Sequence, residues 1–245
     1  MPIRTALLTL LLLHGSATTI DSVALPSPQA EPARRILIIG NSLTYTWNVP
    51  ELVAEMAARA GEPRPVIRAV TYADFSLEDH WNRGEALDLL RTGRFDVMVM
   101  QQGPSTMAAS QANLLEWSRR WVDEARKIGT RSALYAVWPP KGGDLDAGIA
   151  SYLNAAVATG SALLPVSHAW RLAWQDTPRP ALYGPDDFHP GPDGAWLAAL
   201  VIAAMLFDRP VADFANILPE RIGADLEVVL RSAATEAILT HGRAP

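Results

Sequence analysis

Apolar runs of strand length alternate with helical patterns along most of this chain, and this alternation constrains its fold more than any other feature. Strand-like runs occupy residues 35–40, 65–72, 95–101, 131–138 and 162–166. Helical patterns occupy residues 48–60, 76–91, 107–128, 146–159, 195–207 and 224–241. Strands that are separated by long helices favour a parallel sheet with helices on both faces. We therefore predict an α/β fold, with Asn48 as the N-cap of the first long helix.

The N-terminus has the features of an export signal. Arg4 precedes an apolar run over residues 6–13, and Gly15-Ser16-Ala17 and Ser22-Val23-Ala24 offer small residues before a cleavage point. The run is shorter than the roughly twenty residues that span a bilayer. We predict a signal peptide over residues 1–24, a disordered lead-in over 25–34 and one domain over 35–245, in a periplasmic or secreted protein. An uncleaved anchor or a buried N-terminal helix are the alternatives.

Composition excludes several classes of protein. The chain of 245 residues has no cysteine, which excludes disulfides, thiolate metal sites and a cysteine nucleophile. Its net charge of −5 provides no basic surface for nucleic acid. No cluster of His, Asp and Glu has metal-ligand spacing, and no glycine-rich phosphate loop is present. We expect no cofactor, no metal, no nucleic-acid partner and no stable membrane span after signal cleavage.

Ser42 directly follows the first predicted strand. In open parallel sheets the site lies beyond the carboxyl ends of the strands, where Ser42, residues 73–75, residues 101–105 and Trp138 would collect. A serine near helix N–H groups is placed for attack, because those dipoles favour the anion that acyl transfer creates. Gly, Asn and Ser are also ordinary turn residues. By itself, the segment therefore allows two roles for Ser42: a catalytic nucleophile or a residue that caps a turn.

His189 is the candidate base for such a serine. It stands in the turn-rich loop DDFHPGPDG, and Asp186 precedes it by three residues. The carboxylate of an Asp-x-x-His loop can hold the second imidazole nitrogen and so fix the tautomer. The alternative is a surface loop whose Asp and His cap the following helix.

Four segments, taken in order, resemble the SGNH/GDSL hydrolase superfamily, and most closely the branch that opens with GNS. They are IIGNSLTY at residues 38–45, TYADFSLEDHW at 71–81, FDVMVMQQGPS at 95–105 and DDFHPGPDGAWLAAL at 186–200. The second is similar to the G-G-x-S-L-x-x-H stretch of that branch. The resemblance implies a flavodoxin-like, three-layer α/β/α sandwich with a parallel sheet of about five strands.

The same resemblance implies roles for individual residues. Ser42 would be the nucleophile, His189 the general base and then acid, and Asp186 the carboxylate that orients it. The oxyanion hole would use the Ser42 backbone N–H, a backbone N–H of the second block and an amide side chain of the third.

Two departures from the family pattern affect the oxyanion hole. Where relatives have glycine in the second block, this chain has Ala73 and Asp74. A positive φ there costs less for aspartate than for alanine, and an Asp74 carboxylate would oppose an oxyanion or bind a substrate hydroxyl. The family's third-block asparagine is absent, so Gln101 or Gln102 must serve. Because side chains alternate along a strand, only one would face the site, and we favour Gln101.

Further candidates are substrate-binding residues near the strand ends: Asn41, Trp47, His80 and Trp138. Tryptophan faces suit sugar rings, although tryptophan more often fills a core. His80 is equally well read as a surface histidine of its helix, and His168 is expected to be structural.

These observations predict an exported serine esterase that cleaves an oxygen ester through an acyl-serine intermediate. The substrate would be a small-molecule or saccharide ester, with acetyl on a saccharide as the favoured case by analogy. Two alternatives remain: an acyltransferase to a sugar hydroxyl, and a non-catalytic saccharide-binding module.

Overall fold

The structure is a computed structural model, and it describes residues 32–176 and 179–242. The expected signal peptide and most of the expected lead-in lie outside these residues. Arg34 falls within the expected lead-in, yet its carbonyl accepts a 2.8 Å hydrogen bond from Val66 N. Its guanidinium contacts the Leu206 carbonyl and the Phe207 ring. The prediction of disorder is therefore wrong for Arg34, which packs against the domain.

The centre of the fold is a five-stranded parallel sheet with the order β2-β1-β3-β4-β5. The strands are β1 (Arg35–Gly40), β2 (Val66–Thr71), β3 (Val97–Met100), β4 (Arg131–Tyr135) and β5 (Ala162–Leu164). Unbroken apolar runs form β1 and β3 because both faces of these central strands are covered. This order is the flavodoxin-like one, so the predicted sheet is confirmed.

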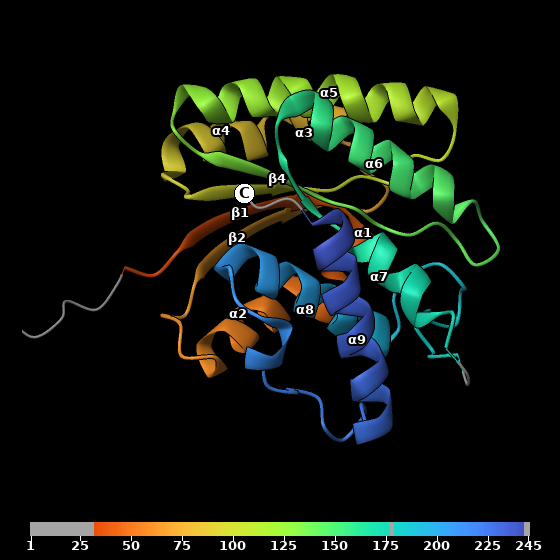
Figure 1. Cartoon of the computed structure of the whole chain (residues 1–245). Coiled ribbons are helices and arrows are strands. Elements are labelled where there is room, and N and C mark those ends of the chain that lie inside the picture. Colours follow the sequence, from red (N-terminus) through yellow and green to blue (C-terminus); the bar gives the residue numbers. More distant parts are fainter. Residues whose placement is uncertain (1–31, 177–178, 243–245) are drawn as a thin grey trace, which may run out of the picture. The chain divides into compact units, whose positions relative to one another are not determined.

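Helices cover both faces of the sheet and complete the predicted three-layer sandwich (Figure 1). One face carries α3 (Leu77–Arg83), α4 (Glu85–Gly93), α5 (Ala108–Lys127) and α6 (Leu145–Thr159). The other carries α2 (Val49–Arg59), α7 (Val166–Ala173), α8 (Pro192–Phe207) and α9 (Ala224–His241). Among the described residues, no helix combines the length and the apolar character that crossing a membrane requires.

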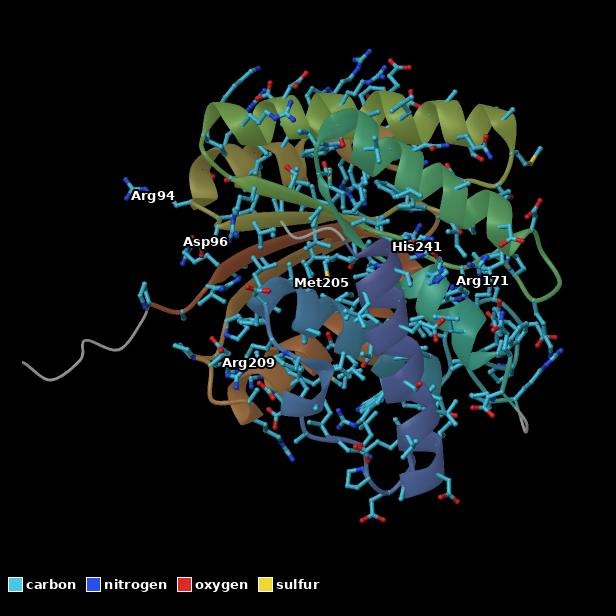
Figure 2. All side chains as sticks on the ribbon, viewed as in Figure 1. Arg94, Asp96, Arg171, Met205, Arg209 and His241 are labelled. Atoms are coloured by element: carbon cyan, nitrogen blue, oxygen red, sulfur yellow. The ribbon has the colours of Figure 1, made fainter. Side chains whose placement is uncertain are left out.

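Helix α8 is buried on all sides, as its nearly continuous apolar sequence requires. At Gly194 a Cβ atom would lie 2.2 Å from the Leu182 carbonyl oxygen and 2.3 Å from the Trp170 ring. Only glycine therefore lets the preceding loop pack this closely on the helix. Arg209 follows α8 and donates to the Ala60 carbonyl at 2.8 Å, which ties the ends of α8 and α2 together (Figure 2).

Two local predictions need correction. The helix expected over residues 76–91 is divided into α3 and α4, because Gly84 has a left-handed φ of 84° and closes α3. Helix α2 begins at Val49 as expected, but Asn48 itself is left-handed with φ 50° and its side chain makes no capping hydrogen bond. The sequence patterns also missed two short helices, α1 (Ser42–Tyr45) and α7.

Candidate active site

Ser42 lies where the strand order reverses. It is the first residue of α1, directly beyond β1, and β1 lies between β2 and β3. Neighbouring crossovers leave the sheet in opposite directions at such a point, and this opens a crevice beyond the strand ends. Ser42 is 7% exposed and lines a pocket of about 510 Å³ there. Its hydroxyl makes no hydrogen bond with any residue that the structure describes.

The turn that carries Ser42 is held by Gln101, which follows β3. Gln101 Oε1 accepts hydrogen bonds from Asn41 N at 2.9 Å and Thr44 Oγ1 at 2.8 Å. Its Nε2 donates to Asn41 Oδ1 at 2.9 Å and to the Gln102 carbonyl at 2.5 Å. Gln101 is fully buried, and both amide hydrogens are used. The structure therefore corrects the expectation that Gln101 serves an oxyanion: it positions the serine turn.

Gly40 and His80 complete this support. A Cβ atom on Gly40 would lie 2.6 Å from Gln101 Oε1 and 2.6 Å from Thr44 Oγ1, so the contact requires glycine. His80 Nε2 donates to the Gly40 carbonyl at 2.8 Å. His80 is fully buried, and burial lowers its pKa. The prediction that His80 lies at the surface or contacts substrate is therefore wrong, because it is a neutral core histidine behind the strand end.

Asp186 and His189 form the expected pair. Asp186 Oδ2 accepts a 2.5 Å hydrogen bond from His189 Nδ1, and Oδ1 accepts from Phe188 N and His189 N. The imidazole bond, followed by these backbone bonds, lowers the pKa of Asp186 to about 2. The carboxylate is therefore ionised over the ordinary pH range and holds the ring with Nδ1 protonated. Nε2 is left free to act as a base.

The loop that carries His189 is fixed to the end of β4. Trp138 Nε1 donates to the Phe188 carbonyl at 3.0 Å, and Gly184 N donates to the His189 carbonyl at 2.8 Å. Trp138 is itself fully buried and stacks on Trp170, with ring centroids 3.6 Å apart. The expected role of Trp138 as a sugar platform is thus corrected, since no face of its ring is open to a substrate. Its indole anchors the histidine loop.

Two candidate backbone donors belong to residues that line this pocket. Ser42 and Asp74 both line it, and neither backbone N–H has an acceptor among the described residues. Asp74 has φ 62°, the left-handed conformation that would suit glycine. Aspartate adopts it more readily than most residues, because its short side chain tolerates the geometry. Both N–H groups are therefore candidate donors to a tetrahedral oxyanion, which backbone N–H groups stabilise when they point at it.

Gln102, rather than Gln101, lines this pocket. Its Oε1 accepts from Leu77 N at 3.1 Å, which fixes the orientation of the amide. Its Nε2 donates to Ser105 Oγ at 3.0 Å and more weakly to the Ser110 carbonyl at 3.5 Å. Asn41 also lines the pocket, with Nδ2 donating to the Phe75 carbonyl at 3.1 Å.

Four further residues line the pocket: Phe75, Ser105, Met107 and Phe188. Phe75 and Ser105 fall in the ranges 73–75 and 101–105 that were expected at the strand ends, and Phe188 lies in the loop between Asp186 and His189. Met107 was not singled out by the sequence patterns as a site residue. Thr44 is the one polar side chain of α1 after Ser42 that bonds to Gln101, and its position two residues after Ser42 is the only sequence signal for that role. In residues 32–176 and 179–242, no group of three His, Asp or Glu side chains is arranged to hold a metal ion.

The fold and this arrangement were compared with known proteins. No protein-family model matches the sequence, and no curated protein matches it. Among solved structures, a candidate SGNH hydrolase from Slackia heliotrinireducens is similar at 26% identity and a TM-score of 0.61, over 70% of this chain and 98% of that one. A DUF4886 family protein from Bacteroides uniformis has 18% identity and a TM-score of 0.70, over 87% and 98%. A lipase/acylhydrolase from Enterococcus faecalis has 14% identity and a TM-score of 0.57, over 69% and 93%.

These similarities confirm the resemblance to SGNH/GDSL hydrolases that the four sequence blocks indicated, while the assignment to the GNS branch stays a prediction. The chain has the SGNH hydrolase fold, and its structural neighbours include SGNH hydrolases and a lipase/acylhydrolase. They support the prediction of a serine ester hydrolase.

Proposed function

We propose that the chain hydrolyses an oxygen ester through an acyl intermediate on Ser42. The observation that carries this proposal is the Asp186–His189 pair, joined at 2.5 Å, in a fold that places Ser42 at the switch point of the sheet. A serine hydroxyl is a weak nucleophile and needs an oriented base. Asp186 supplies that orientation, and it stabilises the imidazolium that forms when His189 takes the proton.

The proposed reaction has two steps. His189 Nε2 takes the Ser42 proton while Oγ bonds to the ester carbonyl carbon, and the same histidine then protonates the departing alcohol as the carbon–oxygen bond breaks. Water, deprotonated by His189, next attacks the acyl-serine and releases the acid, and Ser42 regains its proton. The backbone N–H groups of Ser42 and Asp74 would hold the oxyanion in both steps. Losing one such donor typically costs about a hundredfold or more in rate. Gln102 Nε2 already donates to Ser105 and Ser110, so Gln102 would support the pocket wall and not the oxyanion.

Labelling by a fluorophosphonate probe tests this mechanism, together with hydrolysis of nitrophenyl acetate. We expect the parent to label and turn over. Ser42→Ala and His189→Ala should lose labelling and at least about a thousandfold in kcat. Ser232→Ala, on the exposed side of α9, is the matched serine control and should behave as the parent. A folded parent that neither labels nor turns over would overturn the proposal.

We also propose export and an acylated saccharide substrate. The pattern of residues 1–24 supports export, and N-terminal sequencing of the protein recovered from a bacterial periplasm tests it. An intact first residue in the recovered protein would contradict cleavage. Apolar side chains such as Phe75, Met107 and Phe188 share the wall of the 510 Å³ pocket with Ser and Asn residues, which suits a small acyl group such as acetyl.

A further inference from the structure

A second pocket is lined by the Asp186–His189 pair but not by Ser42. Its volume is about 620 Å³, and its walls include Trp47, Tyr183, Asp186, His189 and Asp193. Ser42, Asp74 and Gln102 line the first pocket instead. The proposed catalytic groups are therefore divided between two hollows, one with the nucleophile and oxyanion donors and one with the base.

Trp47 is an unusual residue for its position. Its φ of 59° and ψ of 16° place a bulky side chain in the left-handed region, and Asn48 follows with φ 50°. Such conformations are strained and persist mainly where the surroundings or function require them. Glycine or asparagine would form this turn with less strain. Trp47 is nevertheless 46% exposed at the pocket, with the Arg221 guanidinium 5.1 Å from its ring centre.

Asp193 supplies an independent sign of a ligand. It is only 9% exposed and lines the pocket, yet no described residue donates a hydrogen bond to its carboxylate. Arg221 interacts with it only through charge, beyond ion-pair distance. Because Asp193 lines the pocket and its carboxylate accepts no hydrogen bond from a described residue, the carboxylate is available to accept hydrogen bonds from a bound ligand.

We propose that this second pocket holds the alcohol half of the ester, and that this alcohol is a neutral polyhydroxylated ring of the pyranoside type. Trp47 would stack on the apolar face of the ring, and Asp193 would accept hydrogen bonds from its hydroxyls. The assignment rests on the proposed function. His189 must hand its proton to the alcohol oxygen as the bond to the acyl carbon breaks, so the alcohol must lie beside His189. The acyl group then lies in the first pocket.

Two acetyl esters that differ only in the alcohol test the assignment. A mono-O-acetyl methyl pyranoside is compared with ethyl acetate, for the parent, Trp47→Asn and Asp193→Asn. Asparagine at position 47 removes the ring but still accepts the left-handed turn. We expect both variants to lose about tenfold in kcat/KM on the pyranoside ester, with ethyl acetate changed by less than about twofold. Asp225→Asn is the matched control, because Asp225 is the second residue of α9 as Asp193 is of α8, and it is exposed.

A binding measurement separates this inference from the catalytic proposal. Ser42→Ala is titrated with the deacetylated methyl pyranoside by calorimetry, with and without Trp47→Asn. Binding that is lost with Trp47 supports the pocket even when the parent shows no turnover. Equal losses on both esters, an unchanged pyranoside ester, or binding that does not depend on Trp47 would each overturn the assignment.

Discussion

The serine turn depends on residues that never touch a substrate. Gln101 uses all of its amide capacity on Asn41, Thr44 and its own neighbour, and His80 holds the Gly40 carbonyl from behind. These bonds join the ends of two adjacent strands. Because buried polar groups must be paired, the removal of one member leaves another without a partner. The position of Ser42 is therefore set by a network of neighbours.

Asp74 lines the first pocket in a left-handed conformation, with φ 62°. We expect Asp74→Asn to raise kcat/KM on nitrophenyl acetate by about threefold or more, because it removes a negative charge beside the developing oxyanion. Asparagine keeps the left-handed conformation with φ 62° that the turn needs. Steady-state kinetics at constant ionic strength would measure the effect.

Asp208→Asn is the control for this substitution. Asp208 is also left-handed, with φ 52°, and it lies at the end of α8 outside both pockets. It should leave the kinetics unchanged. A fall in activity for Asp74→Asn alone would show that the carboxylate serves the substrate or the turn and does not oppose the oxyanion.

At the level of elements, α3 is a short helix with a defined cap at each end. Ser76 caps α3 in a capping box with Asp79, and Gly84 closes the helix with φ 84°. The amide of Gly84 donates to the His80 and Trp81 carbonyls. His80 lies in α3 between these two caps, and its Nε2 reaches the Gly40 carbonyl at the end of β1 at 2.8 Å.

Gly84 allows a direct test of the cap that ends α3. A Cβ atom at Gly84 would meet nothing within 4 Å, so the cost of Gly84→Ala is conformational alone. We expect a loss of about 1–2 kcal/mol in the free energy of unfolding, measured by urea denaturation. Gly84→Asn should lose less, because asparagine tolerates the left-handed region.

Gly223→Ala is the matched control, since its Cβ would also meet nothing within 4 Å but its φ is −68°. An equal loss for Gly84→Ala and Gly223→Ala would contradict the conformational explanation.

At the level of the whole molecule, α7 and α9 meet through a buried histidine. His168 on α7 stacks on His241 at the end of α9, and Arg171 Nη2 donates to His168 Nδ1 at 2.8 Å (Figure 2). Burial, followed by the nearby His241 and Arg171 charges, lowers the pKa of His168 to about 4. His168 is therefore neutral in the folded protein near neutral pH, in line with its expected structural role.

The buried His168 predicts that the free energy of unfolding falls as the pH is lowered. The folded pKa of about 4 lies below the unfolded value of 6.5, so the unfolded chain binds the proton first as the pH falls. The stabilisation is complete above pH 6.5 and is lost between pH 6.5 and about 4, by at most about 1.4 kcal/mol per pH unit. The buried His80 acts in the same direction.

Urea denaturation at pH 7, 5.5 and 4.5 would measure this loss for the parent and for His168→Gln. Glutamine can still accept a hydrogen bond from Arg171, so we expect the variant to fold and to show a shallower dependence on pH. Parallel curves for the two proteins would contradict the role of His168.

The sequence by itself determined the features that local patterns encode. Continuous apolar runs marked the central strands, the spacing of Asp186 and His189 marked a local pair, and Ser42 followed from its place after β1. These features depend on residues that are near one another in the chain. The apolar run of a strand and the spacing of an Asp-x-x-His loop are both properties of one short segment. Such local patterns therefore agree with the structure.

Only the tertiary structure decided which polar and aromatic residues face the pockets. Gln101 and Gln102 are adjacent in sequence, yet the first is enclosed by the serine turn and the second lines the pocket. Trp138 and His80 are fully buried, whereas Trp47 is exposed. Burial and hydrogen-bond partners arise where segments far apart in the chain meet, as Asn41 meets Gln101 and Trp138 meets Phe188. The sequence of one segment does not show which other segment will pack against it.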